Sequence, residues 1–207
     1  MLEYYMFHKP RGCITARCDA RQRTVMDYFP NDKRDILFPV GRLDKDTEGF
    51  IIITNDGRLC FDLMNPANKV PKTYFFWAQG ILTKDKIREL ESGVNIYKNR
   101  GAETAPAKIT VENPGILREI KSLLVGNDIK ISNRRGDLPV VSGYITITEG
   151  KKHQVKRMLG YADCRVVYLK RISIGDVLLD ENLRPGEYRD LTSSEIDKLN
   201  KKYSSIT

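Results

Sequence analysis

The chain has 207 residues and carries 35 Lys and Arg against 27 Asp and Glu, a formal net charge of +8 at pH 7. A chain of this length can bury a real hydrophobic core, as one domain or as two tightly packed lobes, and its basic character suits a polyanionic partner. The N-terminus lacks a basic region followed by an apolar run, and no apolar stretch approaches roughly 18 residues, which argues against export or membrane insertion and predicts a cytoplasmic protein.

Several segments show the β-branched or alternating pattern that is typical of strands, in the order 3–8, 50–54, 73–79, 107–112, 143–148 and 165–174. Helices are predicted at 58–64, at 84–90 after Thr83 as N-cap, and at 152–159 with Val155, Met158 and Leu159 on one face. Residues 192–195 match a capping box that opens a terminal helix. By itself this pattern predicts only the α+β class.

Asp44 lies on a polar turn that leads directly into the apolar strand predicted at 50–54. Gly49 precedes that strand and Asn55 follows it, so the strand is short and Asp44 is predicted at the rim of a sheet. Catalytic groups are often held at such rims, because a rigid sheet fixes them while the turn leaves them accessible. A solvated acidic turn is the alternative, since Asp is common in turns for local hydrogen-bonding reasons.

No metal or cofactor is predicted. Asp44, Asp46 and Glu48 follow the first half of a calcium loop, but Asn55 stands where the loop requires a bidentate glutamate. The four cysteines show no C-x-x-C spacing, the two histidines do not complete a zinc pattern, and nucleotide-binding glycine motifs are absent from the sequence. We therefore expect reduced thiols and chemistry that proceeds without a cofactor.

Basic residues gather in two segments. Between Lys151 and Arg171 there are seven Lys or Arg against a single acid, Asp163. A second set lies near the start of the chain and consists of Lys9, Arg11, Arg17, Arg21 and Arg23. Such clusters are typical of surfaces that bind a polyanion, although an ordinary solvated charged face has the same composition.

A series of sequence blocks occurs in order between residues 9 and 192. They are Lys9-Pro10-Arg11-Gly12, Gly41-Arg42-Leu43-Asp44 with Thr54-Asn55-Asp56-Gly57, Lys72-Thr73-Tyr74, residues 149–158 (EGKKHQVKRM) and residues 183–192 (LRPGEYRDLT). These blocks resemble the motifs of RNA pseudouridine synthases, in the branch that acts on bacterial ribosomal RNA. Within that branch, residues 153–158 are most similar to the small-subunit (16S) enzyme, which favours 16S over 23S RNA as substrate.

The resemblance implies a fold and an activity. The fold is the pseudouridine synthase fold, a mixed, largely antiparallel sheet with flanking helices and a central cleft. The activity is the site-specific isomerisation of uridine to pseudouridine in ribosomal RNA, without a cofactor. The implied catalytic group is Asp44, which could attack the sugar or the base or remove a sugar proton.

The resemblance also implies partners for Asp44. Tyr74 would stack on the target uracil, although a core aromatic is the alternative because Tyr74 would share a strand face with Phe76. A cation is needed to keep Asp44 ionised, and Arg157 is the first choice for it. Lys156 is the second choice, because the motif aligns with related families in two registers that differ by one residue. For both residues the alternative role is contact with a phosphate. Lys72 could pair with Asp44 or with a phosphate. The residues expected to contact RNA are Arg42, Lys72, Lys9, Arg11, Lys151, Lys152, His153, Gln154 and Lys156.

Two features depart from the family pattern. The opening motif begins at Lys9, so we expect a single catalytic domain over residues 1–207 without a separate N-terminal RNA-binding domain. Residues 113–139, rich in Gly, Asn and charge, are expected to form a family-variable insertion.

The expected partner is ribosomal RNA or a ribosome assembly intermediate, bound by a monomer. A catalytically silent RNA-binding or ribosome-assembly protein on the same scaffold is the alternative function. The presence of Asp44, Tyr74 and Arg157 together favours the enzyme, because a pure binder has no need for a desolvated carboxylate that faces RNA.

Overall fold

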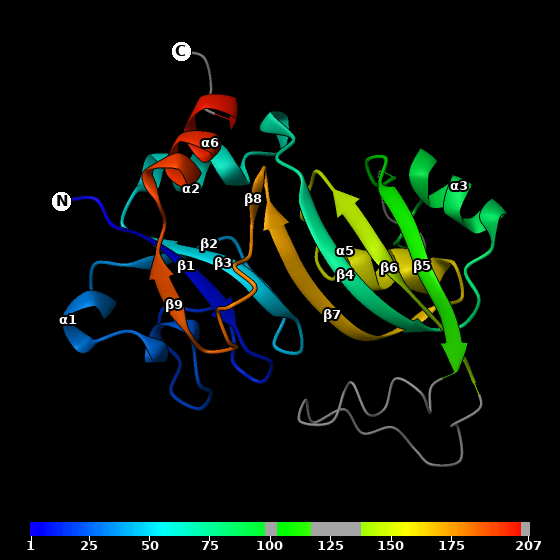
Figure 1. Ribbon diagram of the computed structural model, residues 1–207, viewed down its shortest axis with the longest axis horizontal. Helices are drawn as coiled ribbons and strands as arrows, with labels where there is room; N and C mark the ends of the chain where they lie inside the picture. Colours follow the sequence, from blue (N-terminus) through cyan, green and yellow to red (C-terminus); the bar gives the residue numbers. More distant parts are fainter. Residues whose placement is uncertain (98–102, 117–137, 204–207) are drawn as a thin grey trace. The chain divides into compact units, whose positions relative to one another are not determined.

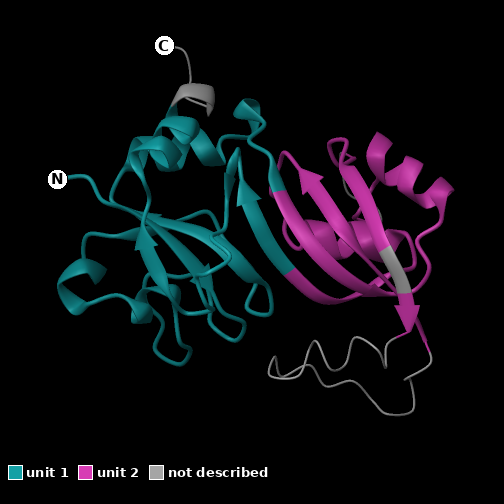
Figure 2. Cartoon of the chain, viewed as in Figure 1, with its two compact units in different colours: residues 1–72, 170–207 teal, residues 73–169 magenta. Residues whose placement is uncertain are grey.

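The computed structural model describes residues 1–97, 103–116 and 138–203 (Figure 1). The chain divides into two compact units (Figure 2). Unit 1 consists of Met1–Lys72 and Lys170–Thr207, and unit 2 consists of Thr73–Leu169. Within the three described ranges, no helix is long and apolar enough to cross a membrane.

Unit 1 is built around the strand β3 (Glu48–Thr54). Strands β1 (Tyr4–Lys9) and β2 (Phe38–Val40) pair with β3 in antiparallel fashion, and β9 (Tyr188–Asp190) pairs with β1. The end of β7 (Arg165–Ile174) runs parallel to the start of β3 and also pairs with the short β8 (Val177–Leu178). Its helices are η1 (Val25–Tyr28), α1 (Asn31–Arg34), α2 (Gly57–Met64), η2 (Pro66–Asn68) and α6 (Ser193–Tyr203).

The strand β3 is buried along its whole length, because its two faces pack into different hydrophobic clusters. Phe50 and Ile52 join a cluster that includes residues of α2 and α6, which pack together (Figure 1). Ile51 and Ile53 join a cluster that includes aromatic side chains of β1 and η1. Burial on both faces explains why β3 is a continuous apolar run in the sequence, and each fully buried side chain of this kind contributes roughly 1.5–3 kcal/mol.

Unit 2 contains a sheet with the strand order β5-β6-β4-β7. The strands are β4 (Lys72–Gln79), β5 (Lys108–Ile116), β6 (Pro139–Ile147) and the first half of β7. Strands β5 and β6 pair antiparallel, α3 (Lys84–Ser92) lies beside β5, and α5 (Gln154–Tyr161) precedes β7 (Figure 1). Side chains of β4 alternate between buried and half-buried, as expected for a strand with one covered face.

The predicted α+β class and the longer predicted elements are confirmed, with shifted ends. Strand β3 begins at Glu48 and strand β6 at Pro139, both earlier than predicted. Helix α5 begins at Gln154 instead of residue 152, because His153 has a left-handed backbone (φ 54°) that cannot continue a helix. The structure adds α1, β2 and β8, which are too short to give a periodic pattern, and strand β9 lies within the family block at residues 183–192.

Hydrogen bonds test two predictions about where helices begin. Thr83 accepts a bond from the backbone N–H of Lys86 and thus caps α3 as predicted. The predicted capping box is present, with Thr192 N–H donating to Glu195 and Glu195 N–H donating to the Thr192 hydroxyl. The predicted insertion at 113–139 lies mostly outside the described residues; residues 113–116 belong to β5, and Pro139 begins β6.

Gly49 permits the close approach of β3 and β7. Its φ is +110°, and a Cβ atom built on it would lie 2.2 Å from the backbone oxygen of Arg171 and 2.6 Å from the Arg171 nitrogen. Only glycine fits a backbone contact of this kind.

Gly49→Ala should therefore lower the free energy of unfolding by roughly 3 kcal/mol or more, because the β3–β7 pairing must open. Gly57→Ala is the matched control: a Cβ at Gly57 meets nothing within 4 Å, and alanine at the start of α2 should stabilise by up to about 1 kcal/mol. Urea unfolding measures both values. Equal midpoints for the two variants would contradict this account of Gly49.

Candidate active site

Asp44 lies in the turn between β2 and β3, where the sequence predicted it. The turn is closed by a bond of 3.1 Å from the Thr47 N–H to the backbone oxygen of Asp44. Asp44 is half-buried, whereas Arg42, Lys45 and Asp46 are exposed. The turn therefore presents one partly shielded carboxylate, flanked by solvated charged groups.

The side chain of Lys9 lies beneath this turn and is fully buried. Its Nζ donates to the backbone oxygens of Thr47 at 2.8 Å, Pro10 at 3.0 Å and Lys45 at 3.4 Å. Burial lowers the pKa of Lys9 to about 8, although nearby groups, Asp46 and Asp44 among them, favour the charged form. Lys9 was predicted to contact RNA. Its burial and its three carbonyl partners argue against that role and assign it to holding the Asp44 turn.

Thr15 supports the same turn from the segment after β1. Its hydroxyl donates to the backbone oxygen of Leu43 at 2.9 Å and accepts the Leu43 N–H at 3.1 Å. The Gly12 N–H donates to the backbone oxygen of Lys45 at 2.8 Å. Sequence reasoning missed Thr15, because a lone threonine carries no signal that its hydroxyl will pair with a distant backbone.

Other buried charged groups of unit 1 bond to backbone oxygens. Arg171 is buried, and its Nε donates to the Phe50 oxygen at 2.7 Å. The Lys72 ammonium donates to the Val70 oxygen at 3.0 Å and weakly to the Leu63 oxygen at 3.5 Å. Burial, and secondarily the charge of Arg171, lowers the pKa of Lys72 to about 8. These contacts argue against the predicted pairing of Lys72 with Asp44 or with a phosphate.

A buried carboxylate, Glu48, stands at the start of β3. The His8 Nε2 is 3.9 Å from the Glu48 Oε1, and the His8 Nδ1 is 2.6 Å from the backbone oxygen of Leu183. His8 and Glu48 are both buried. They link β1 and β3 to the C-terminal segment, which is a structural role.

The other predicted catalytic residues belong to unit 2. Tyr74 is only 7% exposed and shares the buried face of β4 with Phe76 and Ala78. Lys156 and Arg157 follow each other on α5 and are half-buried. The Arg157 guanidinium lies 4.4 Å over the centre of the Tyr97 ring, a cation–π contact within unit 2.

The start of the predicted RNA-binding motif is partly a structural network. Gln154 is buried; its amide donates to Glu149 at 2.8 Å, and its carbonyl oxygen accepts the Lys151 N–H at 2.9 Å. Lys151 forms an ion pair with Glu149 at 3.4 Å. Gln154 therefore shapes the entry to α5, which argues against its predicted contact with RNA. Lys152 and His153 are exposed and Arg11 is half-buried, so these predictions stay open.

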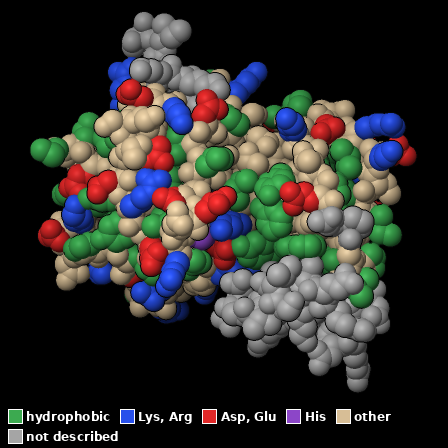
Figure 3. Space-filling model, viewed as in Figure 1, with side chains coloured by type: hydrophobic (Ala, Val, Ile, Leu, Met, Phe, Trp, Pro, Cys, Tyr) green, Lys and Arg blue, Asp and Glu red, His purple; other side chains and the backbone are tan. Residues whose placement is uncertain are grey.

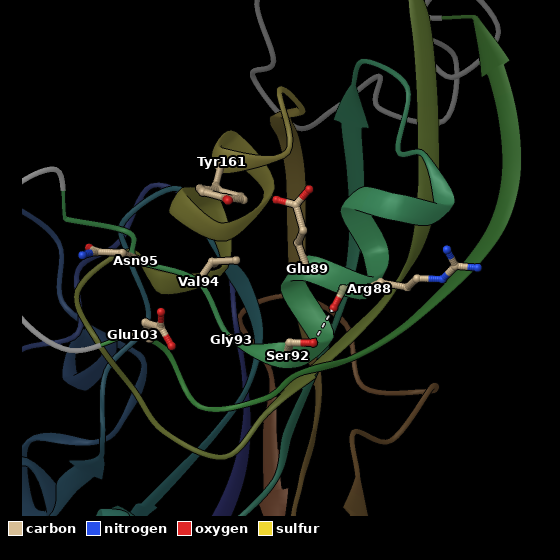
Figure 4. Close-up of a pocket in the computed structure, with 8 residues that line it drawn as sticks. All are labelled: Arg88, Glu89, Ser92, Gly93, Val94, Asn95, Glu103 and Tyr161. Atoms are coloured by element: carbon tan, nitrogen blue, oxygen red, sulfur yellow. Dashed lines mark hydrogen bonds between the residues drawn. The ribbon is translucent and has the colours of Figure 1, made fainter.

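Unit 2 also contains an open pocket of about 490 Å³ (Figure 4). It is lined by Arg88, Glu89, Ser92, Gly93, Val94, Asn95, Glu103 and Tyr161. The predicted site residues are not among these, so the pocket does not support any of the predicted roles. Within the described ranges, no three His, Cys, Asp or Glu side chains are grouped so that they could hold a metal ion.

Charged side chains are mixed on the face of the molecule that Figure 3 shows. Lys and Arg side chains there stand beside Asp and Glu side chains and do not form a continuous basic surface.

Comparison with known proteins gives consistent matches. The model of the RNA pseudouridylate synthase family matches residues 3–161. An uncharacterized RNA pseudouridine synthase of Bacillus subtilis (strain 168), YtzG, is 44% identical over 198 residues, which cover 95% of this chain and 73% of that protein. The ribosomal small subunit pseudouridine synthase A of Pseudomonas aeruginosa is 33% identical over 193 residues, covering 93% of this chain and 72% of that protein.

A solved structure matches as well. The crystal structure of a pseudouridylate synthase superposes with a TM-score of 0.78 at 32% sequence identity, covering 96% of this chain and 74% of the other. This likeness confirms the fold that the sequence motifs implied.

Lys9→Met should lower the free energy of unfolding by about 2–3 kcal/mol at neutral pH, because backbone oxygens buried beneath the turn lose their donor. The loss should also depend on pH. The pKa of Lys9 is about 8 in the folded chain against an ordinary 10.5, so the folded chain releases this proton first. The cost of burying the charge is complete below pH 8 and is relieved as the pH rises toward 10.5.

The stability difference between the parent and Lys9→Met should therefore grow across that pH range. Urea unfolding of both proteins at several pH values measures this difference. Lys72 titrates in both proteins, so its contribution to the pH dependence cancels when the two free energies are subtracted. A difference that is constant with pH would contradict the depressed pKa of Lys9.

Proposed function

We infer the reaction of this chain from one premise: it belongs to the RNA pseudouridylate synthase family. The chain is therefore an enzyme that converts uridine in RNA to pseudouridine. We propose ribosomal RNA of the small subunit as its substrate. The proposal is supported by the likeness to the Pseudomonas aeruginosa enzyme, whose name assigns it to the small ribosomal subunit.

The chemistry requires one well-placed carboxylate. The bond between uracil N1 and the ribose C1′ breaks, the base turns, a bond forms between C5 and C1′, the C5 proton leaves and N1 gains a proton. Atoms and electrons balance without a group donor or an oxidant. A carboxylate can start the sequence by attacking the sugar or the base, or by removing a sugar proton.

We assign this role to Asp44. Its turn is fixed from below by the Lys9 ammonium and the Thr15 hydroxyl, while its side chain stays partly accessible. A fixed and half-buried carboxylate is what nucleophilic or general-base catalysis requires, because little reorganisation is then needed in the transition state. This support of the Asp44 turn is the observation that carries the proposal.

Tyr74 is proposed as the aromatic group that stacks on the target uracil. A uridine within RNA must first leave its stack, which costs a few kcal/mol that stacking on an aromatic ring can offset. Its low exposure is also what a core residue would have, so the role of Tyr74 depends on its effect on catalysis.

The cation that assists the reacting carboxylate is proposed to come from α5. Arg157 was the first choice on sequence, but its guanidinium already stacks on Tyr97. Because that contact gives Arg157 a structural role within unit 2, we propose Lys156, the second choice, as the cation that assists the reacting carboxylate. Arg157 would then stabilise the segment that follows α3.

Purified protein should release tritium from ribosomal RNA labelled at uridine C5. Asp44→Asn should lower this rate by roughly 10³-fold or more while leaving folding and RNA affinity intact, because it keeps the shape and removes the nucleophile or base. Asp46→Asn is the matched control, since Asp46 is an exposed carboxylate of the same turn, and should change the rate by less than about threefold. Equal losses from both variants would favour a metal-binding or solvated-turn role for the acidic cluster, whereas no release by the parent on naked RNA and on assembly intermediates would favour a silent RNA-binding protein.

Single-turnover rates at saturating enzyme should separate the two cations of α5. Lys156→Ala should depress the saturated rate by about 10²-fold, as expected when a catalytic group is deprived of its electrostatic partner. Arg157→Ala should change that rate by less than about tenfold and should lower the melting temperature, because the cation–π interaction with Tyr97 is removed. A larger rate loss for Arg157→Ala than for Lys156→Ala would instead indicate that Arg157 is the cation that assists the reacting carboxylate.

A further inference from the structure

The basic segment between β1 and η1 forms a second surface beside the Asp44 turn. We propose that residues 17–23, which we call the arginine turn, bind phosphates of the RNA strand next to the target uridine, with Arg21 as the principal ligand. The proposal rests on the proposed function for the identity of the nucleic acid. It also assigns a role to basic residues that the catalytic site does not use.

The arginine turn is tied to the Asp44 turn by hydrogen bonds from both sides. The Lys45 ammonium donates to the side-chain oxygen of Gln22 at 2.9 Å, so the residue after Asp44 touches the residue after Arg21. At the base of the segment, the Thr15 hydroxyl pairs with the backbone of Leu43. The arginine turn therefore lies next to the turn that carries Asp44, and we expect the phosphates that flank a bound nucleotide to meet it.

The arginine turn has a fixed shape. A carboxylate oxygen of Asp19 accepts the backbone N–H groups of Arg21 and Gln22, each at 2.8 Å. The longer loop that carries the arginine turn is closed because the Ile14 N–H donates to the Arg23 oxygen at 2.9 Å and the Val25 N–H to the Ile14 oxygen at 3.0 Å. A turn held in this way loses little conformational entropy when it binds a ligand.

Its charge suits an anion. The segment carries three Arg against the single Asp19, and one oxygen of that carboxylate is occupied by the turn itself. All three arginines are exposed. The planar fork of an arginine can donate two hydrogen bonds to one phosphate, which makes arginine well suited to RNA backbones.

The three arginines differ in how much they serve the fold. The Arg17 Nη2 donates to the backbone oxygen of Asp35 at 2.7 Å, and the Arg23 guanidinium lies 4.1 Å over the Tyr28 ring. Within the described parts of the chain, the Arg21 guanidinium has no hydrogen bond or ion pair. Replacing Arg21 should therefore leave the fold unchanged, and it is the residue on which the proposal can be tested cleanly.

The test compares Arg21→Ala, Arg21→Lys and a matched control, Arg88→Ala, in binding to a transcript of small-subunit ribosomal RNA at several salt concentrations. Arg88 is an exposed arginine of α3 that pairs with Asp85 at 3.0 Å. Arg21→Ala should bind about tenfold more weakly, with a salt slope shallower by about 0.7 for each single-strand phosphate that the arginine no longer neutralises. Its melting temperature should match that of the parent.

Arg21→Lys should keep the salt slope and recover only part of the affinity, because it retains the charge and lacks the fork. Arg88→Ala should bind like the parent. Parent-like affinity and slope for Arg21→Ala, or an equal loss of affinity for Arg88→Ala, would overturn the proposal. If the parent forms no pseudouridine and Arg21→Ala alone still weakens binding, the proposed reaction fails and the phosphate-binding surface stands.

Discussion

The geometry of the Asp44 turn depends on one buried ammonium group. Lys9 reaches under the turn from the end of β1 and bonds to three backbone oxygens, two of them in the turn itself. Taking a charge out of water is costly, and the pKa of Lys9, lowered to about 8, reflects that cost. The hydrogen bonds to the carbonyl oxygens offset this cost only while those oxygens stay in place. The buried ammonium therefore favours the one backbone conformation of the turn that keeps these bonds.

The scaffold around this interaction is correspondingly rigid. Strand β3, which the turn enters, is buried on both faces, and Gly49 lets the backbone of β7 approach it to a distance that no other residue allows. The buried strand β3 holds the turn in place, and the turn leaves the Asp44 carboxylate partly accessible. The arginine turn, held by its own Asp19 and by Gln22, extends the same fixed surface toward a polyanionic strand.

Much of this arrangement could be predicted from the sequence. The apolar run of β3, the N-cap at Thr83 and the capping box at Thr192 are local patterns, and each was found where its residues predicted it. The family motifs predicted the fold. The roles of single polar residues could not be predicted in the same way, because a sequence motif does not indicate which way a side chain points. Lys9 and Gln154 were predicted to contact RNA, but both are buried. Arg157 stacks on Tyr97 across a stretch of chain that no local pattern spans.

We propose that this chain forms pseudouridine in small-subunit ribosomal RNA through Asp44. The most direct measurement is to map pseudouridines in ribosomal RNA from cells that lack the chain, and from the same cells supplied with the parent or with Asp44→Asn. The account predicts that a pseudouridine is missing from the small-subunit RNA, that the parent restores it, and that Asp44→Asn does not. An unchanged pseudouridine map in the deficient cells, or restoration by Asp44→Asn, would contradict it.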